Sequence, residues 1–200
     1  MNFFLQNKTP FSDTLVALDK YIFTSLNSLG TKNWDPFWLL VTEQKNWIPL
    51  FLVLFFLLFK VYGFKKGIIL LVLSALFITF SDQLVNLIKA HYQRLRPCSD
   101  DSLNNTIRAV LQRGSFSFVS GHSTTSFAMS TFFILLLKNH FKYIKLLIIW
   151  PILFASSRVY LGVHFPLDIF TGMYLGIIEG FLFWHLTQIT LRKNFVRNLD

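Results

Sequence analysis

The sequence predicts an all-α fold, a polytopic membrane bundle of five to six transmembrane helices with an N-terminal interfacial helix. Hydrophobic residues fill 53% of the 200 positions and only 14% are charged, whereas a soluble domain carries about 25% charged residues. Several apolar runs are long enough to cross a bilayer. Because no linker or repeat divides them, residues 1–200 are expected to form a single integral-membrane domain.

The first 46 residues are expected to lie at the membrane interface, ahead of a transmembrane core at 47–191. Residues 12–29 begin with Ser12 as a plausible helix cap, and Asp19 and Lys20 in the middle of the segment argue against a full span. If the segment crosses nevertheless, the number of spans becomes six. Its apolar side chains fall on one helical face: Leu15, Leu18, Ile22, Leu26 and Leu29.

Residues 34–46 are too short and too polar to cross the membrane alone. They predict a helix at half depth, with Trp34, Trp38 and the adjoining Trp47 at the level of the headgroups, where tryptophan is enriched.

Five apolar segments then predict five spans. Their approximate ranges are 47–62, 67–88, 123–137, 143–160 and 167–190. Pro151 is expected to kink the fourth. Four polar side chains inside the spans are expected to face the bundle and to form hydrogen bonds between helices: Asp82, Gln83, Asn86 and Glu179.

The connections between spans carry the information on orientation. Three basic groups fall on one side of the membrane, which the positive-inside rule makes cytoplasmic: Lys60, Lys65 and Lys66; Lys138, Lys142 and Lys145; and Arg192, Lys193 and Arg197. The net charge of +9 therefore has a membrane explanation, and no nucleic-acid partner is expected. The sole cysteine, Cys98, excludes an intramolecular disulfide and a cysteine-only metal site. No obligate protein partner is evident either.

The opposite side carries two stretches whose side chains could bind or react with a substrate, within 89–122 and 157–168. In the second, His164 and Asp168 are four residues apart, so a helical turn would put the carboxylate beside the imidazole and fix its tautomer. Arg158 offers a planar fork suited to phosphate oxygens. The alternative is that Arg158 and Asp168 form an interfacial ion pair, with His164 reaching to the membrane surface.

The first stretch supplies further anion-binding groups. Lys89 and Arg96 are two helical turns apart and can point toward one place. Ser120 and Gly121 lead into a predicted helix, whose free N–H groups and dipole favour an anion. His122 lies at the same rim and could donate a proton.

These residues form three motifs that resemble the signature of the type 2 phosphatidic acid phosphatases, which are related to the vanadium haloperoxidases. The family pattern K-x6-RP, PSGH and SR-x5-H-x3-D corresponds here to Lys89-x6-Arg96-Pro97, Ser120-Gly121-His122 and Ser157-Arg158-x5-His164-x3-Asp168. The chain has Val119 where the family usually has proline, a position that shapes the turn rather than the chemistry.

The resemblance implies a mechanism without metal or other cofactor. His164 would attack phosphorus and form a phosphohistidine, Asp168 would orient the ring, and His122 would protonate the leaving oxygen. Five groups would bind the phosphate oxygens: Lys89, Arg96, Ser120, Gly121 and Arg158. The implied substrate is a lipid phosphate that enters from the bilayer.

The sequence leaves the substrate open. Undecaprenyl diphosphate is favoured because the chain has no added soluble domain. Phosphatidic acid, phosphatidylglycerol phosphate and the phosphates of lipid A are alternatives. A haloperoxidase-like use of the anion pocket is disfavoured by the membrane embedding. A non-catalytic protein that binds or transports anionic lipids would need cations but not the two histidines. The expected location is the bacterial inner membrane, with the active site on the periplasmic face.

This topology predicts the accessibility of Cys98. If the basic connections are cytoplasmic, Cys98, two residues after Arg96, lies on the outer face. A membrane-impermeant maleimide added to intact spheroplasts should therefore label it. Labelling that requires lysis would place the site in the cytoplasm.

Overall fold

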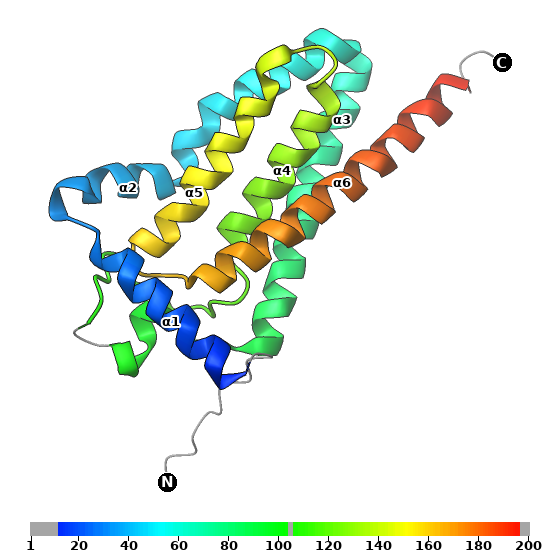
Figure 1. The fold of residues 1–200 in the computed structure, drawn as a ribbon. Helices are drawn as coiled ribbons and strands as arrows, with labels where there is room; N and C mark the ends of the chain where they lie inside the picture. The colour runs from blue at the N-terminus through cyan, green and yellow to red at the C-terminus, as the bar shows by residue number, and fades with distance from the viewer. Residues whose placement is uncertain (1–11, 104–105, 197–200) are drawn as a thin grey trace.

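The structure is a computed structural model that describes residues 12–103 and 106–196, with side chains placed up to residue 191. Every regular element within these ranges is a helix, and the helices pack as a tilted bundle (Figure 1). The all-α fold predicted from the sequence is therefore confirmed. Arg197 lies outside the described residues, and only the backbone is described at Arg192 and Lys193.

The helix α3 (Ile48–Tyr92) contains two limbs. Its backbone leaves the helical conformation at Gly63, where φ is 74° and ψ is 171°. Glycine adopts such a positive φ without a steric penalty, and the chain reverses there, so the second limb runs back along the bundle (Figure 1). The limbs correspond to the predicted spans 47–62 and 67–88.

Three stretches are long and apolar enough to cross a membrane: Gln44–Leu103, which holds both limbs of α3, Lys142–Tyr160 and Pro166–Leu191. The remaining predicted span corresponds to α4 (Gly121–Leu137), which has 17 residues and is largely buried among the others. The count of five spans stays a prediction.

Pro151 does not kink the middle of a helix. The segment begins as a 3₁₀ helix, η5 (Lys142–Ile148), and continues as α5 (Ile149–Tyr160). Pro151 therefore falls in the first turn of α5, where a missing N–H removes no helical hydrogen bond. The expected kink is replaced by the change from 3₁₀ to α geometry.

The N-terminal helix α1 (Asp13–Ser28) forms as predicted, and the N–H of Leu15 donates to Ser12 Oγ at 3.4 Å. Its leucine-rich face points away from the protein; Leu29 is 76% exposed. The buried face holds Asp19, Phe23 and Asn27. Such a helix, with its apolar face outward, suits a position along the lipid interface.

The segment 34–46 is two helices rather than one. The helix α2 (Asp35–Thr42) ends at Glu43, whose backbone is extended, and the 3₁₀ helix η2 (Gln44–Trp47) follows. Trp34 is exposed, whereas Trp38 stacks on Tyr160 and Trp47 packs against Trp150. Two of the three tryptophans expected at headgroup level thus pack against α5.

The prediction for polar residues in the spans holds only in part. Glu179 in α6 is buried near Ser81 of α3. In contrast, Asp82, Gln83 and Asn86 are exposed. The second limb of α3 turns a stripe containing Ser74, Phe77, Ser81 and Val85 inward, so Gln83 and Asn86 face outward. Asp82, beside this stripe, lies at the wall of a cavity.

The helix α6 (Pro166–Val196) packs closely on α4 through a row of glycines, Gly172, Gly176 and Gly180. A Cβ at Gly172 would lie 2.8 Å from the carbonyl oxygen of Ser120, and one at Gly180 would lie 2.5 Å from that of Ala128. Small residues that let two backbones approach are a common basis of helix association in membranes. This contact brings the start of α4 beside the start of α6.

We expect Gly176→Ala to weaken this contact. A Cβ there would collide with the carbonyl oxygen of Thr124, and overpacking of this kind lowers the free energy of unfolding by about 1–3 kcal/mol. Thermal unfolding in detergent measures the loss. Gly114→Ala is the matched control, because no atom lies within 4 Å of an added Cβ at that position. Equal stability of the two variants would contradict the role of the glycine row.

Candidate active site

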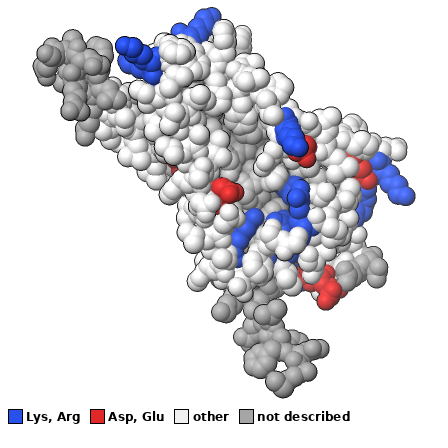
Figure 2. All heavy atoms as spheres, turned by 180° about the vertical axis from the view of Figure 1, so that it is seen from behind, with Lys and Arg blue, Asp and Glu red and all other residues white. Residues whose placement is uncertain are grey.

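The three sequence motifs meet at one end of the bundle, around a cavity of about 320 Å³. The reversal at Gly63, the connection between α4 and α5, and the C-terminal end of α6 lie at the other end (Figure 1). Figure 2 shows basic side chains gathered around a hollow on an otherwise largely uncharged face. The lining residues are Thr42, Glu43, Gln44, Asp82, Val85, Lys89, Arg96, Arg113, Ser115, Gly121, His122, Thr125, Arg158 and His164.

His164 is held between a carboxylate and a guanidinium. Its Nδ1 lies 3.3 Å from Oδ2 of Asp168, and its Nε2 lies 2.9 Å from Nη1 of Arg96. Since the carboxylate only accepts and the guanidinium only donates, we assign the proton to Nδ1 and a lone pair to Nε2. Burial, followed by the neighbouring Arg96 and Arg158, holds the pKa of His164 well below its usual value. The ring is therefore neutral, and the lone pair of Nε2 accepts from Arg96 at the wall of the cavity.

Asp168 lies behind His164 and does not line the cavity. It is fully buried in the first turn of α6. Its Oδ1 accepts from Nη1 of Arg94 at 2.7 Å, and its Oδ2 accepts from the N–H of Phe165 at 2.9 Å and from the hydroxyl of Ser117. The carboxylate thus has partners on both oxygens and a fixed orientation.

The cations of the cavity are anchored by the surrounding chain. Arg96 donates to Ser115 O at 2.6 Å, to Ser115 Oγ at 2.8 Å and to Val163 O at 2.9 Å. Arg158 donates from Nη1 to Oγ1 of Thr42 at 2.6 Å. Its buried Nε has no hydrogen-bond partner among the described residues.

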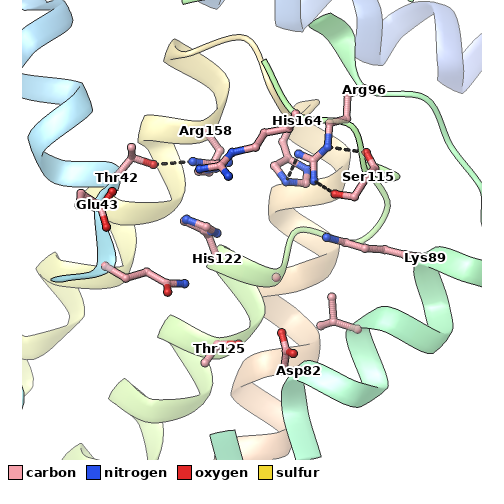
Figure 3. Close-up of a pocket in the computed structure, with 14 residues that line it drawn as sticks. Thr42, Glu43, Asp82, Lys89, Arg96, Ser115, His122, Thr125, Arg158 and His164 are labelled. Atoms are coloured by element: carbon pink, nitrogen blue, oxygen red, sulfur yellow. Dashed lines mark hydrogen bonds between the residues drawn. The ribbon is translucent and has the colours of Figure 1, made fainter. Parts of the chain in front are cut away.

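The start of α4 completes the wall. Ser120 caps the helix, because its Oγ accepts from the N–H of Ser123 at 3.4 Å. Gly121 and His122 face the cavity, and His122 stacks on Phe154 with ring centroids 4.6 Å apart. Figure 3 shows His122 and His164 on opposite sides of one space, with Lys89 and Arg158 beside them.

The structure therefore brings together the residues singled out in the sequence, in two layers. Those that line the cavity are Lys89, Arg96, Gly121, His122, Arg158 and His164. Asp168 and Ser120 lie behind them, fully buried. The hydroxyl of Ser120 is engaged in the helix cap, so direct phosphate binding by it stays a prediction.

Sequence reasoning missed several residues at the site. Arg113 is a fourth cation lining the cavity. In the sequence, only the number of arginines in the outer connection indicated a further cation there. Arg94 and Ser117 hold Asp168. Arg94 stands at an unspecified position inside the first motif, and Ser117 lies shortly before the second. Thr42 and Glu43 come from a segment with no recognisable signal, because a contact across about 116 positions leaves no local pattern.

A histidine oriented by a carboxylate and facing fixed cations at the end of a membrane bundle is an arrangement suited to binding a phosphate group. The chain belongs to the PAP2 superfamily, whose sequence profile matches residues 68–192. The resemblance seen in the motifs is thereby confirmed, and the protein is a membrane-embedded lipid phosphatase.

The chain is similar to two lipid A 4'-phosphatases. It is 29% identical to that of Bacteroides thetaiotaomicron, over 87% of this chain and 79% of the relative, and 26% identical to that of Porphyromonas gingivalis, over 83% and 71%. A similar fold occurs in the crystal structure of a transmembrane PAP2-type phosphatidylglycerolphosphate phosphatase from Bacillus subtilis. Its TM-score is 0.69, with 22% identity over 94% of this chain and 89% of that one.

The anchoring of Arg158 predicts the effect of Thr42→Val. The substitution keeps the shape of the side chain but removes the acceptor of a charged hydrogen bond, which is worth about 1.5–3 kcal/mol. The kcat/KM for a lipid phosphate should fall at least about tenfold. Thr79→Val is the control, since Thr79 donates only to Ala75 O within its own helix. An unchanged kcat/KM in Thr42→Val would show that Arg158 does not depend on this bond.

Proposed function

We propose that the enzyme hydrolyses a lipid phosphate ester through a phosphohistidine formed on His164. The observation that carries this proposal is the unprotonated Nε2 of His164 at the cavity, 2.9 Å from Nη1 of Arg96, with Asp168 behind the ring. A phosphate oxygen replaces Nε2 as the acceptor of Arg96 when the substrate binds. Nε2 attacks phosphorus as the bond to the leaving oxygen breaks, and His122 gives that oxygen a proton. Water then attacks phosphorus, returns a proton to His122 and frees His164.

The cations supply the electrostatic part of catalysis. Lys89, Arg96 and Arg158 are placed to hold the equatorial oxygens, together with the N–H of Gly121 at the start of α4. Side-chain cations fixed before the substrate arrives stabilise the transition state without reorganisation. No cofactor is part of the proposal.

An apolar cavity of about 200 Å³ adjoins the polar one and supports entry of the substrate from the bilayer. The two share Gln44, Gly121, His122 and Thr125. The rest of its wall is apolar and includes Phe51, Ile78, Met129 and Trp150. A lipid tail fits here while its phosphate lies against the cations.

For the substrate we propose a phosphorylated sugar lipid of the lipid A class. The two lipid A 4'-phosphatases match more than four fifths of this chain. The polar cavity also contains two carboxylates, Glu43 and Asp82, opposite its cations. Carboxylates near a phosphate are repulsive unless the substrate supplies donors to them, and sugar hydroxyl and amide N–H groups do so.

Undecaprenyl diphosphate, which compact size alone favoured, is the second candidate. Its polyprenyl tail offers no donor to Glu43 or Asp82, and phosphatidic acid and phosphatidylglycerol phosphate offer fewer than a sugar does. The proposed site faces the periplasm from the inner membrane. This placement is supported by the basic connections at the opposite end, and Cys98 in η3 (Pro97–Ser99) is half-buried beside Arg96, where it can report the side.

Phosphate release from pure lipids tests the function. The wild-type protein should act on lipid A with the highest kcat/KM among these four lipids, should resist EDTA and should be inhibited by vanadate. His164→Ala should be inactive, and Asp168→Asn should retain reduced activity. His164→Ala turnover at the wild-type rate would exclude the nucleophile, and loss in EDTA restored by magnesium would exclude the mechanism.

The same assay tests the substrate class. Glu43→Gln combined with Asp82→Asn should lower kcat/KM for lipid A about tenfold, as expected for lost hydrogen bonds to charged groups. It should not lower kcat/KM for undecaprenyl diphosphate, which offers these carboxylates no donor. Gln83→Ala, next to Asp82 but outside the cavity, is the control. An equal effect on both lipids would contradict recognition of a sugar.

A further inference from the structure

A buried chain of charges connects α1 to the catalytic carboxylate. Arg94 donates from Nη1 to Oδ1 of Asp168 at 2.7 Å and from Nη2 to Oδ2 of Asp19 at 2.6 Å. Arg94 is 2% exposed, Asp19 4% and Asp168 not at all. The guanidinium also lies over the ring of Phe165, 4.2 Å from its centroid. Neither Asp19 nor Arg94 lines the cavity.

If this arrangement served only to stabilise the fold, it would be an unfavourable solution. Removing three charged groups from water carries a penalty that apolar residues of similar size would not incur. The formal charges also do not cancel, because two carboxylates flank a single guanidinium and leave one net negative charge. The negative charge that Arg94 does not offset faces His164 and the cations of the cavity.

The surplus charge lies next to the nucleophile. If Asp168 faced Arg94 alone, the pair would be neutral, and the guanidinium would draw the carboxylate's field away from His164. Asp19 offsets Arg94 from its far side, so Asp168 keeps its negative potential at the ring. That potential matters when Nε2 attacks phosphorus and the imidazole becomes positively charged.

Asp19 is itself firmly held. Its Oδ1 accepts from the N–H of Leu167 at 2.9 Å, at the start of α6. Two turns further along α1, Asn27 donates to the carbonyl oxygens of Val159 and Tyr160 at 3.2 and 3.0 Å. Thus α1 is fastened both to the end of α5 and to the start of α6, the two elements that flank His164.

We propose that Asp19 is a positioning residue of the active site, which acts through Arg94 and Asp168 to orient His164 and to support its positive charge during phosphoryl transfer. The family profile begins at residue 68, so this residue lies outside the part of the chain that defines the superfamily. The site of this protein is incomplete without the interfacial helix α1 (Asp13–Ser28).

This proposal for Asp19 rests on the proposed function in one respect: the experiment measures the release of phosphate from a lipid. In the full-length protein in detergent, Asp19→Asn should lower kcat about 10- to 100-fold, by analogy with the outer hydrogen-bond partners of metal ligands. KM should stay within about twofold, because Asp19 does not touch the cavity. Lys20→Gln is the matched control on the same helix: it breaks the ion pair with Asp100, 2.6 Å long, and should leave kcat unchanged.

A double-mutant cycle separates positioning from a general structural role. In an Asp168→Asn background, Asp19→Asn should change kcat by less than about twofold, because its effect runs through the missing carboxylate. Additive losses of kcat in the cycle would overturn the proposal. Equal losses of kcat in Asp19→Asn and Lys20→Gln, or an effect confined to KM, would also overturn it. A wild-type protein that releases no phosphate from any lipid would instead refute the proposed function.

Arg94→Lys provides a second route if Asp19→Asn is not monodisperse. A lysine keeps the charge but cannot reach both carboxylates in a planar fork. Its kcat should fall with KM unchanged, and the fall should again disappear in the Asp168→Asn background. A wild-type kcat in Arg94→Lys would overturn the proposal.

Discussion

The close contact between α4 and α6 is the constraint on which the site depends. Gly172, Gly176 and Gly180 bring one backbone against the other, and polar bonds at the same end lock the register. The N–H of Ser120 donates to the carbonyl oxygen of Asp168 at 3.1 Å. His122 at the start of α4 and His164 just before α6 consequently face one cavity. In a bilayer, where lipid tails are as apolar as side chains, such packing replaces the hydrophobic drive between helices.

The second constraint is the cost of charge at the edge of the membrane. Three charged groups of the site have a defined support: Thr42 for Arg158, Ser115 and Val163 for Arg96, and Arg94 for Asp168. Supports of this kind fix the cations before substrate arrives, so little reorganisation is needed during the reaction. They come from the N-terminal segment and the long outer connection, so these irregular regions are as much part of the site as the helices.

The sequence was most informative where spacing is local. The separation of His164 from Asp168 predicted their contact, because one helical turn relates such positions directly. Lys89 and Arg96 do line one cavity, but helical spacing is not the reason, because α3 ends at Tyr92 and the backbone of Arg96 is extended. The bundle itself followed from composition and apolar runs. Asp82 lines the cavity, but predictions failed for Gln83 and Asn86, because apolarity says that a helix is in the membrane but not which side meets protein. They failed for Pro151 because the preceding turn is 3₁₀.

The sequence by itself determined that the chain forms a membrane bundle, to which superfamily it belongs, and which residues of the three motifs line the cavity. The tertiary structure alone decided which distant residues support them: Thr42 beneath Arg158, Arg113 and the two carboxylates around the cavity, and Asp19 beyond Arg94. The physical reason is the range of the interactions. Helical periodicity links residues a few positions apart, whereas Asp19 and Arg94 meet across 75 positions only because α1 folds back over the junction of α5 and α6.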